Sequence, residues 1–206
     1  MELQFYGANC LSVTYKGARI VIDDNLNELG SKSVTKPEDV ALFTSNTHEV
    51  NARLIFDGPG EYEVSDISVI GIAAQAHVDE PGTQKATMYK LVAAEQSILV
   101  TGHIDPKLTD KQLEAIGHVD VLVIPVGGNG YTIDPNGALQ LIKSIDPKVV
   151  IPTHYADSSL NFPVPQQELS QALKEMAMEP KESVSKLRLK TSELSDVTHI
   201  VVVERS

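Results

Sequence analysis

A change of pattern halfway along the chain constrains its fold more than any other feature. Up to about residue 100, short apolar and β-branched runs alternate with turn residues, a pattern that predicts strands. Beyond it, apolar runs alternate with helical patterns. The first half therefore predicts an almost all-β region, with strands at residues 3–6, 11–15, 18–22, 40–44, 53–56, 62–64, 67–72, 87–91 and 97–100.

The second half predicts strands connected by helices. Thr109 opens a capping box, and Gly117 follows as a stop signal. Asp134 and Pro135 then begin a second helix. Strand runs at 119–124 and 149–151 complete a strand, helix, strand, helix, strand order, which is typical of a parallel sheet with crossovers. We therefore expect an α/β fold.

The last segment, residues 164–206, carries a weaker pattern. It contains a polar amphipathic stretch at about 166–178 and two strand-like runs at 186–190 and 198–203. The length of 206 residues suits one domain. We expect residues 1–206 to form a single domain, with 164–206 as its C-terminal extension.

Composition narrows the classes of partner. The chain has 28 acidic and 17 basic residues and a formal net charge of −11, which argues against nucleic-acid binding because that requires neutralising phosphates. No apolar run is long enough to span a bilayer, and no leader pattern is present. The single cysteine, Cys10, fits a reducing compartment. We predict a cytoplasmic protein without nucleic-acid or membrane partners.

Four of the six histidines directly follow predicted strands. Loops at strand ends are where α/β proteins place their sites, and imidazole is a common metal ligand. His118 and His199 lie beside or within apolar runs, where a packed or surface histidine is the simpler interpretation. The four candidates for chemistry are His48, His77, His103 and His154.

Several segments occur in an order that resembles a known family. They include Asp57–Val64 (DGPGEYEV), Pro125–Gly128 (PVGG) and Ile151–Tyr155 (IPTHY). Over about residues 1–160 the chain resembles the lactonase-like branch of the metallo-β-lactamase superfamily, which includes ascorbate-6-phosphate lactonase. This resemblance implies an αββα sandwich, a metal site at one sheet edge and a hydrolase ancestry.

The resemblance also shows where the sequence departs from the family. The family motif Thr/Ser-His-x-His-x-Asp-His falls on residues 44–50, read here as TSNTHEV. Three histidine positions of the motif are therefore occupied by other residues, and hydroxyls are poor zinc ligands beside imidazole. The lost positions are Ser45, Thr47 and Val50.

The ligand positions that remain are few. Glu49 takes the place of the motif's aspartate, while later ligand positions fall on His77, His103 and His154. The resemblance thus implies that Glu49, His103 and His154 hold one Zn, Fe or Mn ion whose bound water is the nucleophile. His77 and Glu49 are then the candidate catalytic residues. The alternative is that no metal binds and these side chains hydrogen-bond one another.

Other residues are expected to support or line this site. The resemblance places Asp23 near it. Asp157 could orient an imidazole, although a solvated surface aspartate is the simpler interpretation. Tyr131 and Thr132 would line the mouth of the pocket if the family layout holds.

Two functions follow from these expectations. The first is a divergent, single-metal hydrolase acting on a small ester, lactone or phosphate-bearing substrate. The second is a catalytically inactive binding or assembly module that has lost its metals and binds a small molecule or a protein partner. A nuclease of the same superfamily is disfavoured by the acidic balance. Homo-oligomerisation stays open.

Overall fold

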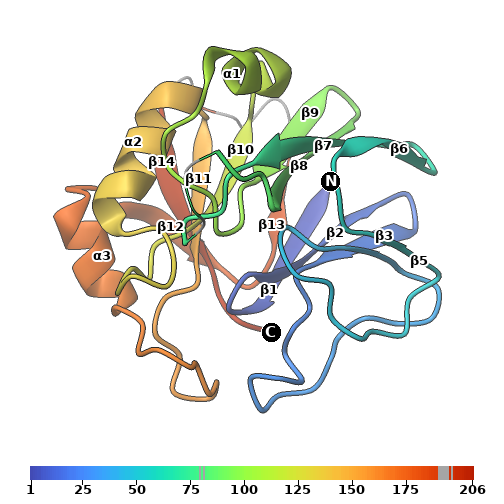
Figure 1. The fold of residues 1–206 in the computed structure, drawn as a ribbon, viewed down its shortest axis with the longest axis horizontal. Coiled ribbons are helices and arrows are strands. Elements are labelled where there is room, and N and C mark those ends of the chain that lie inside the picture. Colours follow the sequence, from blue (N-terminus) through green and yellow to red (C-terminus); the bar gives the residue numbers. More distant parts are fainter. Residues whose placement is uncertain (79, 81, 190–194, 196) are drawn as a thin grey trace.

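The computed structural model describes residues 1–78, 80, 82–189, 195 and 197–206. Lys190, the end of the predicted strand at 186–190, lies outside the described residues. Two β-sheets pack face to face, and helices lie along the outside of one of them (Figure 1).

The first sheet contains the early strands and one late strand. Its antiparallel part includes the predicted hairpin, whose turn is Lys16-Gly17. The next strands continue in parallel. The strand order is β13 (Leu187–Arg188), β1 (Glu2–Gly7), β2 (Cys10–Tyr15), β3 (Ala18–Ile22), β4 (Val40–Leu42) and β5 (Leu54–Phe56).

The second sheet joins the remaining strands of both halves. The strand order is β12 (Pro180–Val184), β14 (His199–Val203), β11 (Val149–Thr153), β10 (Val121–Pro125), β9 (Gln96–Val100), β8 (Ala86–Ala93), β7 (Ile67–Ala74) and β6 (Gly60–Val64). Strands β9, β10, β11 and β14 pair in parallel, which confirms the predicted parallel segment.

The first helix begins and ends at its predicted signals, and the second begins at its predicted signal. In α1 (Asp110–Ile116), Thr109 and Gln112 form both halves of the capping box, and Gly117 caps the other end. Asp134 caps α2 (Pro135–Ile145). The amphipathic stretch gives the short helix α3 (Leu169–Glu175). No helix in the described part of the chain is long and apolar enough to cross a membrane.

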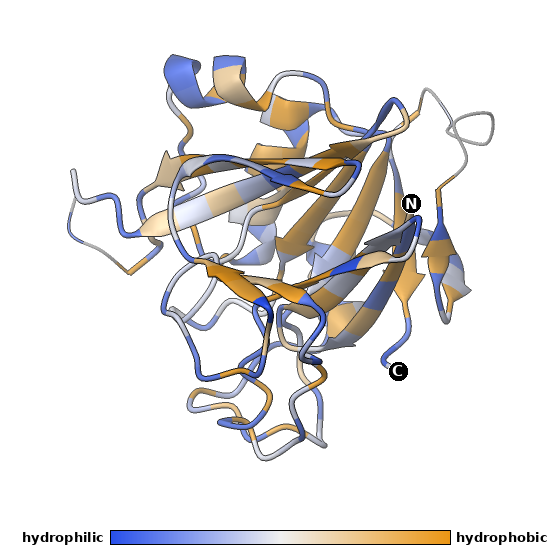
Figure 2. Ribbon diagram, turned by 90° about the vertical axis from the view of Figure 1, so that its right-hand side faces the viewer, coloured by the Kyte–Doolittle hydropathy of each residue, from blue (hydrophilic) through white to orange (hydrophobic). Residues whose placement is uncertain are grey.

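Three apolar clusters hold these layers together. One lies between the sheets, and a second packs the helices onto the second sheet. A third cluster, which includes Cys10, Leu26 and Leu29, lies under the loop that covers the outer face of the first sheet. Hydrophobic residues are correspondingly concentrated in the strands (Figure 2). The predicted metallo-β-lactamase-like α/β sandwich is confirmed by this architecture together with the structural relatives described below.

Strand β12 was not predicted from the sequence. It pairs in parallel with β14 at the edge of the second sheet. Its side chains are mostly exposed, and it begins with Pro180. The run PKESV therefore lacks the apolar alternation on which strand prediction depends.

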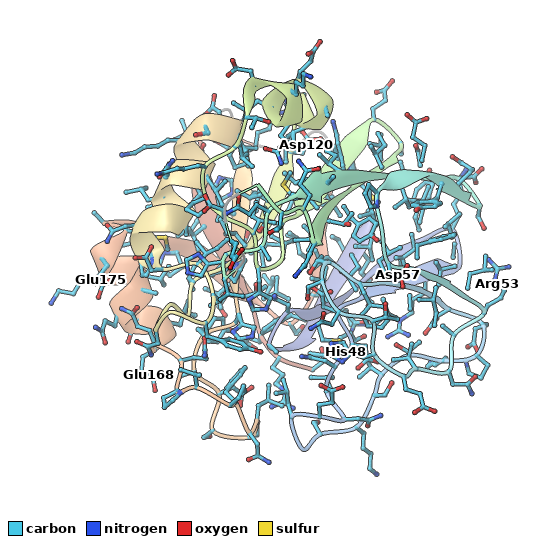
Figure 3. The ribbon with its side chains drawn as sticks, viewed as in Figure 1. His48, Arg53, Asp57, Asp120, Glu168 and Glu175 are labelled. Carbon is cyan, nitrogen blue, oxygen red and sulfur yellow. The ribbon has the colours of Figure 1, made fainter. Side chains whose placement is uncertain are left out.

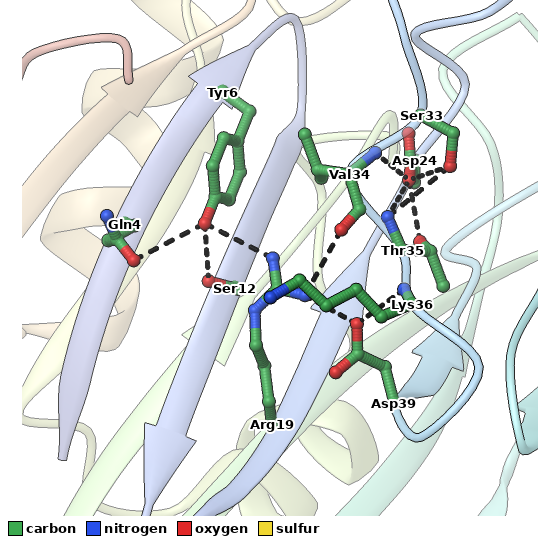
Figure 4. Close-up of polar contacts among 10 residues, drawn as sticks. All are labelled: Gln4, Tyr6, Ser12, Arg19, Asp24, Ser33, Val34, Thr35, Lys36 and Asp39. Carbon is green, nitrogen blue, oxygen red and sulfur yellow. Dashed lines mark hydrogen bonds and ion pairs between the residues drawn. The ribbon is translucent and has the colours of Figure 1, made fainter.

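The covering loop of the first sheet is fixed by two aspartates (Figure 4). The Asp24 carboxylate accepts hydrogen bonds from the backbone N–H groups of Val34 and Thr35 at 2.9 and 2.8 Å. Asp39 accepts from the backbone of Lys36 at 2.7 Å and also pairs with Arg19. These bonds hold residues 33–36 against the strand ends.

Candidate functional site

The candidate site is assembled from loops that follow strands of both sheets. Asp23 follows β3, Thr44 follows β4, His103 follows β9 and His154 follows β11. The backbone N–H of His154 donates to the carbonyl of Ala8 at 2.8 Å, which ties a second-sheet loop to the first sheet. The four loops thereby meet at one edge of the sandwich.

Asp23 and Thr44 form the buried floor of this edge. The backbone N–H and the hydroxyl of Thr44 donate to the two Asp23 carboxylate oxygens at 2.7 and 2.6 Å. Burial raises the pKa of Asp23 to about 6, although the hydrogen bonds from Thr44 lower it. Gly102 has a φ of +61° and lies so close to the Thr44 side chain that a Cβ would overlap it. Asp23 thus lies buried against Thr44, and the supporting role predicted for it stays a prediction.

His103 and His154, called here the imidazole pair, lie ring against ring. Their centroids are 4.6 Å apart in an edge-on arrangement. Tyr131 packs 5.6 Å from the His103 ring, and Phe162 packs 5.0 Å from the His154 ring. These two histidines, which follow strands more than 50 residues apart in sequence, thus form one aromatic cluster.

Both members of the imidazole pair are neutral at ordinary pH. Burial lowers the pKa of His154 to about 4. Burial, together with the nearby His154 and His77, lowers the pKa of His103 to about 3. A neutral imidazole keeps one nitrogen lone pair, so each ring can accept a hydrogen bond or bind a metal.

The two rings do not share the same hydrogen bonding. Nδ1 of His154 contacts the side-chain oxygen of Gln166 at 3.1 Å. Nδ1 of His103 is sealed from solvent and has no hydrogen-bond partner among the described residues. His77 is linked to His103 through its backbone N–H, which donates to the His103 carbonyl at 2.7 Å.

A cavity of about 500 Å³ opens beside His103, and His154 is not part of its lining. The lining includes His103, Tyr131, Ser45, Asn46 and His48. A cavity of this volume suits a small organic molecule. Of the two residues predicted to line the pocket mouth, Tyr131 lies on this cavity, whereas Thr132 is buried and its hydroxyl has no partner among the described residues.

In residues 44–50, called here the motif loop, Thr47 and His48 pair with carboxylates outside the imidazole pair. The Thr47 hydroxyl donates to Asp57 at 2.6 Å, and Nδ1 of His48 pairs with Glu28 at 2.7 Å. Figure 3 shows His48 and Asp57 far from Asp120, which lies beside α1. The loop's polar groups thus form local pairs near the surface.

Glu49 and Val50 lie on a different cavity from the imidazole pair. That cavity, of about 710 Å³, is bounded by residues that include Glu28, Asn51 and Asp24, and its lining contains neither His103 nor His154. The structure therefore brings two of the three predicted metal ligands together and leaves Glu49 apart from them.

The donor set does not fit a three-ligand metal centre. Among the described residues, no three His, Cys, Asp or Glu side chains converge in a way that could hold a metal ion. Catalytic zinc usually takes three protein ligands and a water molecule, whereas the imidazole pair supplies two nitrogens. The predicted set of Glu49, His103 and His154 is not assembled.

Asp157 contacts the loop that follows it and Arg205 in the C-terminal segment. Asp157 accepts hydrogen bonds from the backbone of Ser159 and from Arg205, both at 2.9 Å. Its pKa is lowered by these partners although burial raises it. Asp157 makes no hydrogen bond with an imidazole in the described part of the chain. Sequence reasoning missed Phe162 and Gln166, because neither stands in a motif that points to His154.

Comparison with protein-family models places most of the chain in one family. Residues 2–154 match the model of the beta-lactamase superfamily domain. A metal-dependent hydrolase of Thermoplasma acidophilum is 44% identical to the chain over 48 residues, which is 22% of this chain and 21% of that relative. A metal-dependent hydrolase of Carboxydothermus hydrogenoformans is 44% identical over 45 residues and matched over 20% of its length. The chain thus spans about a fifth of these curated relatives.

Solved structures match over nearly the full length. A protein of Thermotoga maritima, named as a proposed Zn-dependent hydrolase of the metallo-β-lactamase superfamily, is 27% identical, with a TM-score of 0.75 over 98% of both chains. Igni18, a metallo hydrolase of the archaeon Ignicoccus hospitalis, is 17% identical, with a TM-score of 0.63 over 99% of this chain and 94% of that one. The second likeness bears on the fold alone.

Proposed function

The chain belongs to the metallo-β-lactamase superfamily, and from that premise we propose that it is a divergent member that binds a small molecule beside its imidazole pair without the family's metal centre. One observation carries this proposal: no three metal-binding side chains converge among the described residues. The assignment to the lactonase-like branch stays a prediction.

The cavity beside the imidazole pair supports a small ligand. It combines the aromatic faces of His103 and Tyr131 with the polar side chains of Asn25, Asn46 and Asn161. Glu28 and Lys85 add opposite charges to the lining, and Leu29 and Pro163 add apolar surface. Convergent polar groups fix the orientation of a small molecule in its site. A small ester, lactone or phosphate-bearing compound has a size that suits about 500 Å³.

Metal analysis of protein purified without chelator tests the proposal. Mass spectrometry should find far less than one equivalent of Zn, Fe or Mn, and chelator should leave the thermal midpoint unchanged. Turnover of p-nitrophenyl acetate and bis(p-nitrophenyl) phosphate should stay at background. One equivalent of metal together with chelator-sensitive turnover would overturn it.

A second candidate, a single-metal hydrolase, is favoured by a specific observation. Both neutral imidazoles of the pair keep a lone pair, and the curated relatives are named metal-dependent hydrolases. This candidate requires movement of Glu49 or His77 to complete the ligand set. It predicts about one equivalent of metal, lost in His103→Ala and in His154→Ala, with loss of any turnover.

A further inference from the structure

The inference concerns the side chain that contacts His154. Gln166 is 8% exposed and lies in the loop before α3. Its amide nitrogen Nε2 donates to the carbonyl of Val164 at 2.6 Å, and its amide oxygen Oε1 lies 3.1 Å from Nδ1 of His154. The side-chain amide of Gln166 thus contacts both the Val164 carbonyl and the His154 ring.

Hydrogen-bond chemistry decides the orientation of this amide. The atom beside the Val164 carbonyl must be a donor, because two acceptor oxygens 2.6 Å apart would repel each other. Nε2 therefore faces Val164, and Oε1 faces His154. An amide oxygen can only accept, so Nδ1 of His154 must carry the hydrogen.

The remaining nitrogen of His154 is consequently unprotonated. In a neutral imidazole with Nδ1–H, Nε2 holds the lone pair. Nε2 makes no hydrogen bond within the described part of the chain. It is not fully sealed from solvent, in contrast to Nδ1 of His103. His154 therefore presents a solvent-accessible acceptor.

The backbone around Gln166 prevents this arrangement from relaxing. The N–H of Gln167 donates to the carbonyl of Gly127 at 2.9 Å, and the N–H of Ala156 donates to the carbonyl of Gln167 at 2.9 Å. A Cβ on Gly127 would overlap both the His154 carbonyl and the Gln166 side chain. Gly127 thus permits the segment to lie directly against His154.

We propose that Gln166 is a positioning residue that fixes the Nδ1–H tautomer of His154 and leaves Nε2 as an acceptor for a ligand that presents an O–H or N–H group. The ligand side of this inference rests on the proposed function. The tautomer side is a property of the free protein. It assigns a role to the segment after residue 160, for which the sequence indicated none.

Long-range ¹H–¹⁵N NMR of the full chain without ligand tests the tautomer at pH 8, with His154→Asn used to assign the signals. In the wild type, Nδ1 of His154 should show a pyrrole-type shift and Nε2 a pyridine-type shift. In Gln166→Leu this pure signature should be lost, and Nε2 should move toward the pyrrole type.

A neighbouring residue supplies the matched control. Gln167 directs its side chain to Glu175 at 2.7 Å, so Gln167→Leu should leave the His154 signature unchanged. A pyrrole-type Nε2 in the wild type, or a Gln166→Leu spectrum identical to the wild type, overturns the proposal. If Gln166→Leu does not fold, Gln166→Met, which also lacks the amide oxygen, takes its place, and a wild-type His154 spectrum in Gln166→Met overturns the proposal. A metal found by the analysis above contradicts the proposed function but leaves these tautomer results standing.

Discussion

The motif loop and the imidazole pair are two halves of one candidate site, and they are built by different forces. His154 is 3% exposed, and its ring lies within an aromatic cluster. Apart from the buried Thr44, the motif loop is exposed or half-buried, and Thr47 and His48 bond to nearby carboxylates at the surface. Packing fixes the position of the pair, whereas short-range polar contacts fix the loop.

This difference explains why the metal ligands do not converge. A metal centre needs side chains from both halves to point at a common centre. In this chain the buried half presents two imidazoles, and the loop directs its polar groups at Asp57 and Glu28. Changes to the buried half should therefore have large effects, and changes to the loop should have small ones.

The largest effect is expected for Gly127→Ala. The new Cβ would overlap the His154 carbonyl and the Gln166 side chain, so the buried half must shift. We expect a loss of about 4 kcal/mol in the free energy of unfolding, at the upper end of the cost of single substitutions. Urea denaturation measures it.

A second glycine separates this effect from the general cost of replacing glycine. Gly58 has open space where a Cβ would lie and no strained φ. We expect Gly58→Ala to change stability by less than about 0.5 kcal/mol. Equal losses in the two variants would contradict the close packing of Gly127.

The sequence predicted the positions of most strands along the chain and the parallel segment, and it predicted the site only in part. Capping at Thr109 and at Asp134 could be read directly, because the signals are local. The approach of His103 to His154 follows from parallel pairing of β9, β10 and β11, which places their ends at one edge. Gln166 could not be found, since its contact with His154 depends on how a loop without a periodic pattern crosses Gly127.

The next largest effect is the loss of folding stability at low pH that protonation of His154 causes. Its native pKa of about 4 lies below the ordinary 6.5, so the unfolded chain binds the proton more readily. The stability from this group is present above pH 6.5 and is lost as the pH falls through about 4. The shift corresponds to about 3 kcal/mol, which should be absent from the unfolding curves of His154→Gln.

A packing variant controls for the change of core volume at His154. Phe162→Leu alters a ring that contacts His154 but removes no titrating group. It should lower stability at every pH and keep the wild-type dependence on acid. If His154→Gln shows the same pH dependence as Phe162→Leu, the neutral buried imidazole is the wrong description.

Asp23 should act in the opposite direction and slightly more weakly. Burial raises its pKa from 3.8 to about 6, so the native state favours the protonated carboxyl. The stability from this group is present below pH 3.8 and is lost as the pH rises through about 6. Between pH 4 and pH 7, Asp23→Asn should gain about 3 kcal/mol relative to the wild type.

Substitutions of Thr44 test the titration of Asp23 independently. Its hydroxyl and backbone N–H stabilise the Asp23 carboxylate, so Thr44→Val should move the midpoint of the pH dependence upward, whereas Thr44→Ser should not. Parallel pH curves for Asp23→Asn and the wild type would show that Asp23 does not titrate in this range.

The smallest effect is expected on the loop side, for Glu28→Gln. The Glu28 side chain is 63% exposed although it lies 2.7 Å from Nδ1 of His48, and exposed ion pairs contribute little. We expect the free energy of unfolding, measured by urea denaturation at pH 7, to change by less than about 0.5 kcal/mol.

Thr47→Ala should have an equally small effect on stability, because its bond to Asp57 is also exposed. A loss above about 1.5 kcal/mol, a range typical of buried hydrogen bonds to charged groups, would mean that the motif loop is as firmly built as the imidazole pair. The contrast between local polar contacts and buried packing would then no longer explain why the ligands stay apart.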